Sequence, residues 1–174
     1  MHLTRRAFVA LAAAALARPA RSAEGGGLVR HETPLPLAPI VLENRAGEAV
    51  RLEDLRGEVT VLHLWASWCA SCKTEFPSLL AFDVAFRPRG VALVTVSLDR
   101  HGWSTTDRTL TELSARALPV YLDRERNLLS SLKARGLPTS LVIDREGREI
   151  ARATGPLDWA SPEIAAFFER LLRG

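Results

Sequence analysis

The chain has 174 residues, 47% of them hydrophobic and 25% charged, which is typical of one globular domain with a sizeable core. Its two cysteines are too few to staple a miniature secreted fold, and a domain of this length needs no such staple. The formal charge is +3, but residues 1–23 hold four arginines and no acidic residue, so their removal lowers the charge to −1. The basic balance therefore does not indicate nucleic-acid binding.

Residues 1–23 (MHLTRRAFVALAAAALARPARSA) have the layout of an export signal. A basic start ending in Arg5-Arg6 precedes eleven apolar residues (7–17), which is short of the roughly 20 needed to cross a bilayer. The arginine pair resembles the twin-arginine pattern that addresses folded cargo for export, and the alternative is an ordinary secretory signal with two chance arginines. Either route leads to a compartment where disulfides persist.

Residues 24–37 are rich in glycine and proline, show no periodicity, and are predicted to form a flexible leader. The folded domain is therefore expected to span residues 38–174. It contains no internal repeat and no second linker. A β-hairpin is predicted at its start, with strands at 40–42 and 49–52.

Buried strands are predicted next, at 59–65 (VTVLHLW) and 91–98 (VALVTVSL), because both runs are apolar and rich in β-branched residues. Between them, a helix is expected from Cys69 or Ala70 to about Phe86. The remaining predicted elements are a helix near 106–116 capped by Thr105 or Thr106, a strand at 120–122, a helix at 127–134, a hairpin of 140–143 with 149–153, and a final helix with Ser161 as its cap.

Strands that alternate with helices and end in a hairpin predict an α/β protein built as a three-layer sandwich. The two cysteines follow the predicted strand 59–65 and open the helix after it.

The two cysteines lie in WASWCASCKTEFP (residues 65–77), three positions apart at the expected start of a helix. Unpaired backbone N–H groups and the helix dipole favour a thiolate at Cys69, so its pKa should fall below the usual value of about 8.5. Cys72, one turn further in, is expected to be more buried and to resolve a mixed disulfide. A metal site is the alternative, but a second cysteine pair is absent and the histidines show no paired ligand spacing. An inert structural disulfide would gain little from closing so short a loop.

The ordered set of motifs resembles the thioredoxin superfamily and, more closely, its exported TlpA/ResA branch of thiol–disulfide oxidoreductases. WxxWCxxCK follows an apolar strand, and Leu137-Pro138-Thr139 comes some 65 residues later. The closer likeness rests on EDLRG (53–57), CKTEFP (72–77), GLPTSLVIDREG (136–147) and GPLDWAS (155–161). The resemblance covers roughly residues 37–172. It implies a thioredoxin-like α/β/α sandwich with an N-terminal β-hairpin extension and a central αβ insertion.

The resemblance also implies a cis bond between Leu137 and Pro138, with the proline facing the dithiol and the backbone before it pairing with an extended substrate. From the residues alone, Pro138 could equally be a trans turn proline. Trp68 is expected to form an apolar rim beside Cys69. The candidate substrate-binding residues are therefore Trp68, Leu137 and Pro138. Trp159, in the tail motif, is expected to pack rather than bind.

Two ionisable residues are candidates for moving protons. Glu75 lies three residues past Cys72 on the same helix face, at a place where ResA-like proteins carry an acid, and it could take the proton of Cys72; the alternative is an exposed helix glutamate. His63 lies in the buried strand where thioredoxins place an acid, so it is either a proton relay or a core histidine bonded to backbone. Ser71 stands where many relatives have proline and keeps a backbone N–H that proline lacks.

The predicted function is exported thiol–disulfide exchange through Cys69 and Cys72, with no cofactor and no metal. The protein is expected to be a monomer, and the export signal predicts the bacterial periplasm, with a tether to the membrane if the signal is retained. The resemblance implies substrates such as apocytochromes c or copper-site assembly proteins, and a membrane thiol electron donor. The rivals are a copper-binding metallochaperone-like module and a redoxin-type peroxide reductase. The latter usually needs threonine three residues before the attacking cysteine, where this chain has Ala66.

Overall fold

The computed structural model describes residues 27–55, 57–123 and 125–173. In these residues the strands form one mixed sheet in the order β1-β8-β7-β4-β5-β6-β2-β3. Its strands are β1 Val29–Pro36, β2 Val41–Glu43, β3 Ala49–Arg51, β4 Val59–Trp65, β5 Val91–Ser97, β6 Val120–Leu122, β7 Thr139–Ile143 and β8 Arg148–Thr154. The helices are α1 Ala70–Phe86, α2 Trp103–Glu112, α3 Leu128–Ser131 and α4 Pro162–Arg173, with short 3-10 turns η1 Leu52–Leu55 and η2 Arg87–Arg89.

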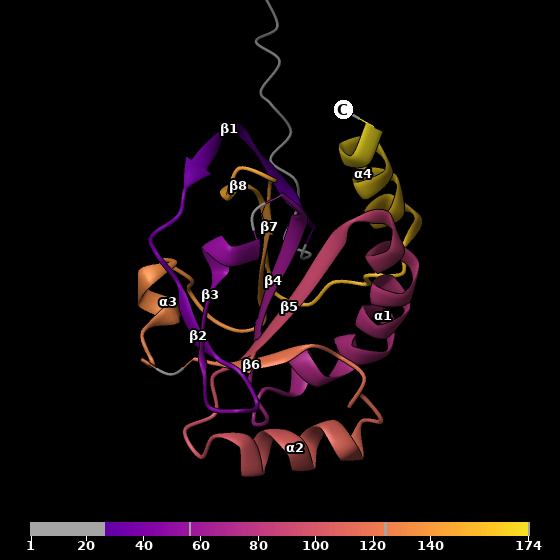
Figure 1. The fold of residues 1–174 in the computed structure, drawn as a ribbon. Helices are drawn as coiled ribbons and strands as arrows, with labels where there is room; N and C mark the ends of the chain where they lie inside the picture. The colour runs from indigo at the N-terminus through magenta and orange to yellow at the C-terminus, as the bar shows by residue number, and fades with distance from the viewer. Residues whose placement is uncertain (1–26, 56, 124, 174) are drawn as a thin grey trace, which may run out of the picture.

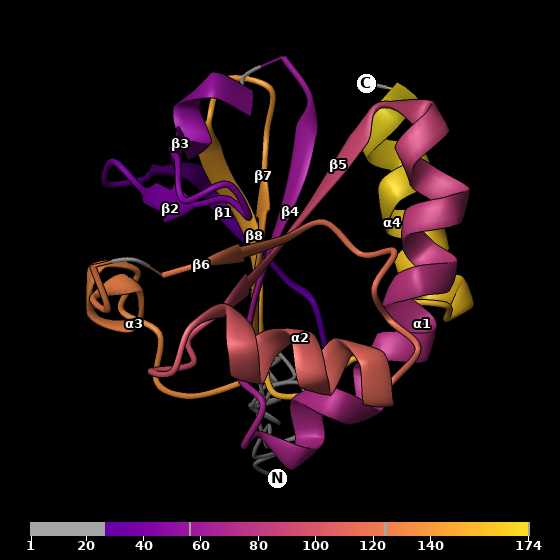
Figure 2. The same cartoon turned by 60° about the horizontal axis from the view of Figure 1, so that its bottom comes forward.

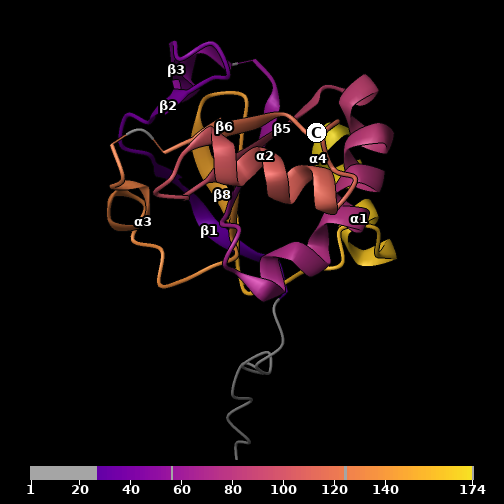
Figure 3. The ribbon, with the colours of Figure 1, turned by 90° about the horizontal axis from the view of Figure 1, so that it is seen from below.

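Helices cover both faces of the sheet, which confirms the α/β sandwich. Helices α1 and α4 lie side by side on one face, and α3 lies on the opposite side (Figures 1 and 2). Helix α2 crosses in front of the strands when the molecule is viewed from below (Figure 3). The predicted N-terminal hairpin, β2 with β3, is an integral part of the sheet because β2 pairs with β6.

The prediction of a flexible leader at 24–37 is wrong for most of its length. Residues Val29–Pro36 form β1, which pairs antiparallel with β8 at the edge of the sheet. Nearly all of its side chains are exposed, so the strand has no apolar alternation for a sequence pattern to detect. Backbone pairing and the contact of His31 Nε2 with Glu149 Oε1 at 2.8 Å hold it instead. The folded domain therefore begins at least nine residues before position 38, and the predicted export signal lies outside the described residues.

Two predicted helices differ from those observed. Helix α2 starts at Trp103, with Gly102 as its N-cap residue. Thr106 does not cap it, because its buried hydroxyl faces the sheet and lies 2.9 Å from Ser97 Oγ. Helix α3 covers only Leu128–Ser131, because the chain turns into the left-handed region at Lys133 (φ 51°).

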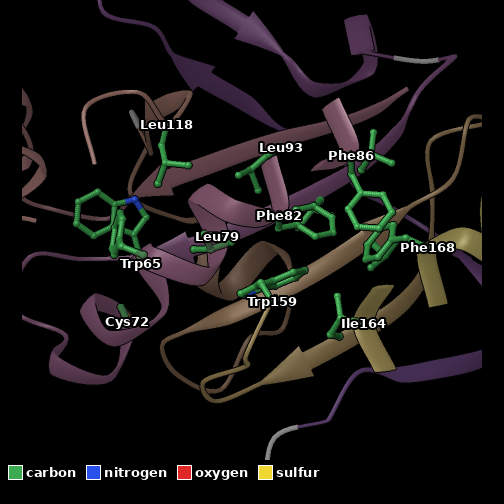
Figure 4. Packing of buried hydrophobic residues seen from close by; sticks show 14 of the residues in the cluster. Trp65, Cys72, Leu79, Phe82, Phe86, Leu93, Leu118, Trp159, Ile164 and Phe168 are labelled. Carbon is green, nitrogen blue, oxygen red and sulfur yellow. The ribbon is translucent and has the colours of Figure 1, made fainter. Parts of the chain in front are cut away.

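The core divides into two clusters, one on each face of the sheet. On β4, Val61 and Trp65 point to the face covered by α1 and α4, whereas Leu62 and Leu64 point to the face covered by α3. The first cluster contains a group of aromatic side chains around Phe82. Figure 4 shows the cluster extending from Trp65 and Cys72 to Phe168. His63 belongs to this first face by the same alternation, so β4 presents it toward α1.

Candidate active site

The dithiol lies where β4 ends and α1 begins. Cys69 is the N-cap residue of α1, with extended backbone angles (φ −86°, ψ 101°), and its Sγ accepts a hydrogen bond from the Cys72 backbone N–H at 3.2 Å. The two cysteines form a disulfide with an S–S distance of 2.02 Å. A sulfur at a helix N-terminus that already accepts a backbone N–H is well placed to carry negative charge once the bond is reduced.

The two sulfurs differ in access. Cys69 keeps 7% of its surface exposed, whereas Cys72 is fully buried in the cluster beneath α1. Ser71, at the position where many relatives have proline, brings its hydroxyl to 3.5 Å from Cys69 Sγ. Cys69 is therefore the more exposed of the two cysteines.

The peptide bond between Leu137 and Pro138 is cis, as predicted. Strand β7 starts directly after it and runs antiparallel to β4, with Thr139 beside Leu64. This register brings the proline loop to the end of β4 from which the dithiol emerges. Leu137 is half-buried and packs against the cluster that includes both cysteines. The structure thus brings together three of the predicted site residues, Cys69, Leu137 and Pro138, at one end of the sheet.

Trp68 leaves 68% of its surface in solvent, which is unusual for so large an apolar side chain. It borders a groove of about 350 Å³. The other residues that line the groove are Leu98, Arg100, Asp123, Arg126 and Leu129. Trp68 therefore has the exposure expected of an apolar rim.

Glu75 is buried, with 2% of its surface exposed, so it is not the exposed helix glutamate of the alternative interpretation. Its Oε1 accepts hydrogen bonds from the Leu157 backbone N–H at 2.8 Å and from Trp159 Nε1 at 3.0 Å. Burial raises the pKa of Glu75 to about 7, although both N–H donors act in the opposite direction. Trp159 thus packs in the core, as predicted, and also binds this carboxyl.

His63 is fully buried, and its Nδ1 lies 2.9 Å from Ser140 Oγ on β7. Its partner is a side-chain hydroxyl and not the backbone. Burial lowers the pKa of His63 to about 3, so the ring is neutral at physiological pH. Its Nε2 lies 3.9 Å from Glu75 Oε2, which brings the two candidate proton-moving residues face to face.

Asp99 is a residue that the sequence interpretation missed. Its carboxylate accepts hydrogen bonds from the Ser67 backbone N–H at 3.0 Å and from Ser97 Oγ at 2.8 Å. It thereby ties the loop before Cys69 to the end of β5. The parallel register of Trp65 with Ser97 is what brings these segments together, so the only signal in the sequence was an acid just after a buried strand.

Two further observations concern membranes and metals. None of the helices in the described part of the chain is long and apolar enough to cross a membrane. Within residues 27–55, 57–123 and 125–173, no three side chains of His, Cys, Asp or Glu are grouped so that they could hold a metal ion.

The raised pKa of Glu75 predicts how stability depends on pH. Below pH 4.5, the wild type should have its largest free energy of unfolding relative to Glu75→Gln. It should lose this difference as the pH rises to about 7, because the folded state holds the proton of Glu75 more tightly than the unfolded state does. The expected loss is roughly 3 kcal/mol, followed by a plateau. The lowered pKa of His63 gives both proteins an opposite slope between pH 6.5 and about 3, so the comparison is made as the difference between the two stability curves. Urea unfolding across this range measures it, and a wild-type advantage that grows with pH would contradict the prediction.

Comparison with known proteins agrees with this geometry. Residues 35–151 match the AhpC/TSA family. The thiol–disulfide oxidoreductase ResA of Bacillus subtilis is 31% identical over 117 residues, which are 67% of this chain and 64% of ResA, so the match spans just under two thirds of that relative. The sporulation thiol–disulfide oxidoreductase A of the same species is 29% identical over 137 residues, 75% of this chain and 81% of the relative. The thioredoxin domain of a thiol–disulfide oxidoreductase from Bacteroides vulgatus superposes with a TM-score of 0.68 at 22% identity, covering 80% of this chain and 97% of that one.

Proposed function

Because the chain belongs to the AhpC/TSA family and its relatives include ResA, we propose that it is a thiol–disulfide oxidoreductase that reduces disulfides in other proteins. The observation that carries the proposal is the disulfide between an N-cap cysteine, Cys69, and a buried cysteine one turn later, Cys72. The two sulfurs have the different access that a two-step exchange requires.

The reaction starts from the reduced dithiol. The Cys69 thiolate attacks one sulfur of the partner's disulfide, forms a mixed disulfide, and releases the partner's other sulfur as a thiolate. Cys72 then gives its proton to Glu75, and its thiolate attacks Cys69 Sγ. The second partner sulfur leaves as a thiolate, so the partner gains two electrons and the protein is left with the Cys69–Cys72 disulfide.

The substrate approaches over Trp68 and pairs with the backbone before Pro138. An exposed indole beside Cys69 and the cis proline loop at the same end of the sheet support this assignment. The substrates are disulfide-containing proteins of the periplasm, such as apocytochromes c or copper-site assembly proteins, and a membrane thiol donor returns the two electrons. This part of the proposal rests on the export signal and on the TlpA/ResA likeness.

The proposal is tested by mixing the reduced protein with oxidised Cys-x-x-Cys-His peptides, which represent apocytochrome c, and with an oxidised copper-site assembly protein. Stoichiometric reduction of either, measured by thiol release, supports the proposal. If neither disulfide is reduced and the protein instead retains Cu(I) against a chelator, it is a copper-binding module. If it instead consumes hydrogen peroxide catalytically, it is a peroxide reductase.

The difference in access between the two sulfurs gives a further prediction. In the reduced protein at pH 7, Cys69 should react with iodoacetamide at least about 10-fold faster than Cys72, because Cys69 is the accessible thiol and the stabilised thiolate. Mass spectrometry of quenched samples measures both rates. Equal rates would remove the basis for assigning Cys69 as the nucleophile.

A further inference from the structure

The carboxyl of Glu75 has one occupied oxygen and one free oxygen. Oε1 accepts hydrogen bonds from two N–H donors, Leu157 and Trp159, which fill its lone pairs. Oε2 is buried and has no hydrogen-bond partner among the described residues. A proton that Glu75 receives must therefore reside on Oε2.

The atom that faces Oε2 is also buried and unpartnered. His63 Nε2 lies 3.9 Å away and makes no hydrogen bond within the described residues. Two orphaned polar atoms that face each other in a core are costly, because each has lost its water. A shift of about 1 Å brings them to hydrogen-bond distance.

The other ring nitrogen of His63 allows the ring to serve either state of Glu75. Nδ1 contacts the Ser140 hydroxyl, which both donates and accepts. When Glu75 is ionised, Nε2 carries the hydrogen and donates to Oε2, while Nδ1 accepts from Ser140. When Glu75 is protonated, Nε2 accepts from the carboxyl, and Nδ1 donates to Ser140.

We propose that His63 is a positioning residue that binds Oε2 of Glu75 in both protonation states, and that the proton taken from Cys72 is held between Oε2 and His63 Nε2. The inference rests on the proposed exchange reaction, since Cys72 supplies the proton and the departing partner thiolate receives it. His63 touches neither sulfur in this account and acts only through Glu75.

The groups that surround the pair leave it isolated. Cys72 on α1 is the titratable neighbour on the same helix face as Glu75. Strand β5 contributes Thr95 beside His63, and β7 contributes Ser140, neither of which is charged. On the segment after β8, the carboxylate of Asp158 is exposed and accepts from the Ala160 N–H. Within the described residues, no other charged side chain is in contact with His63 Nε2 or Glu75 Oε2, which lie 3.9 Å from each other.

The test is the titration of the Glu75 carboxyl by ¹³C NMR in the reduced full-length protein, with the signal assigned by its loss in Glu75→Gln. In His63→Leu both protonation states of Glu75 lose their hydrogen bond to the ring. The ionised state loses more stabilisation than the neutral state, because hydrogen bonds to charged groups are stronger. The midpoint should therefore move up by about one pH unit. His63→Asn keeps a polar side chain in β4 but is too short to reach Oε2, and it should shift the midpoint in the same direction.

The matched control is Thr95→Val. Thr95 is fully buried, lies beside His63 on β5, and donates its hydroxyl hydrogen to the Pro119 carbonyl at 2.8 Å. This variant should leave the midpoint unchanged. An unshifted midpoint in a folded His63 variant, or an equal shift in Thr95→Val, overturns the proposal. The titration involves no partner disulfide, so it gives its answer even if the chain fails to reduce any substrate.

Discussion

Cys72→Ala should trap the protein on its substrate. The Cys69 thiolate still attacks the partner's disulfide, but no second thiol lies behind it to break the mixed disulfide. Turnover of a disulfide substrate should fall by at least about 1,000-fold, because only solvent thiols remain to complete the exchange. The covalent complex should be visible on a non-reducing gel and should disappear with dithiothreitol.

Cys69→Ala is the matched control for this experiment. Cys72 is fully buried on the inner face of α1, so it should form no complex with the same substrate. A complex trapped by Cys69→Ala but not by Cys72→Ala would reverse the roles of the two sulfurs. Recovery of the complex from cells that express Cys72→Ala would also identify the partner.

Phe82→Ala should destabilise the protein by about 3–5 kcal/mol, the usual cost of removing a buried aromatic side chain. Phe82, on the buried face of α1, has its ring centroid 4.9 Å from that of Phe86, 5.3 Å from that of Trp159 and 4.8 Å from that of Phe168. Because Trp159 also donates a hydrogen bond to Glu75, loss of the Phe82 ring should make the position of the Glu75 carboxyl less fixed. Urea unfolding of the oxidised protein measures the loss.

Val84→Ala is the control on the same helix. Val84 has 76% of its surface exposed, so its truncation should change stability by less than about 0.5 kcal/mol. If Phe82→Ala were as mild as Val84→Ala, the aromatic group would not be what anchors α1 to α4 and to Trp159.

Much of the dithiol end of the fold could be predicted from the sequence. An apolar run set β4 at residues 59–65, and the expected helix start agreed with α1 at Ala70. Both elements could be predicted because their signals lie in residues adjacent in the chain: a continuous apolar run for the buried strand, and a cysteine at the N-cap position for the helix. The cis bond before Pro138 was predicted as well, although it came from the resemblance and not from local chemistry.

The features that escaped prediction depend on contacts distant in the chain. Strand β1 has almost no buried face, so only its pairing with β8 reveals it. The burial of Glu75 depends on Leu157 and Trp159, more than 80 positions further on. A pattern on one helix face could suggest an acid near Cys72, but not that one oxygen of the carboxyl is occupied and the other faces His63.

The reduction potential of the Cys69–Cys72 pair, measured in defined thiol buffers, tests the proposed function most directly. A protein that reduces its partners should have a potential near or below the roughly −270 mV of thioredoxin, so that electrons flow from its dithiol to the substrate. A value near roughly −120 mV, as in a strong oxidant, would mean that the protein inserts disulfides. That result would contradict the proposed direction of electron flow and the substrates that follow from it.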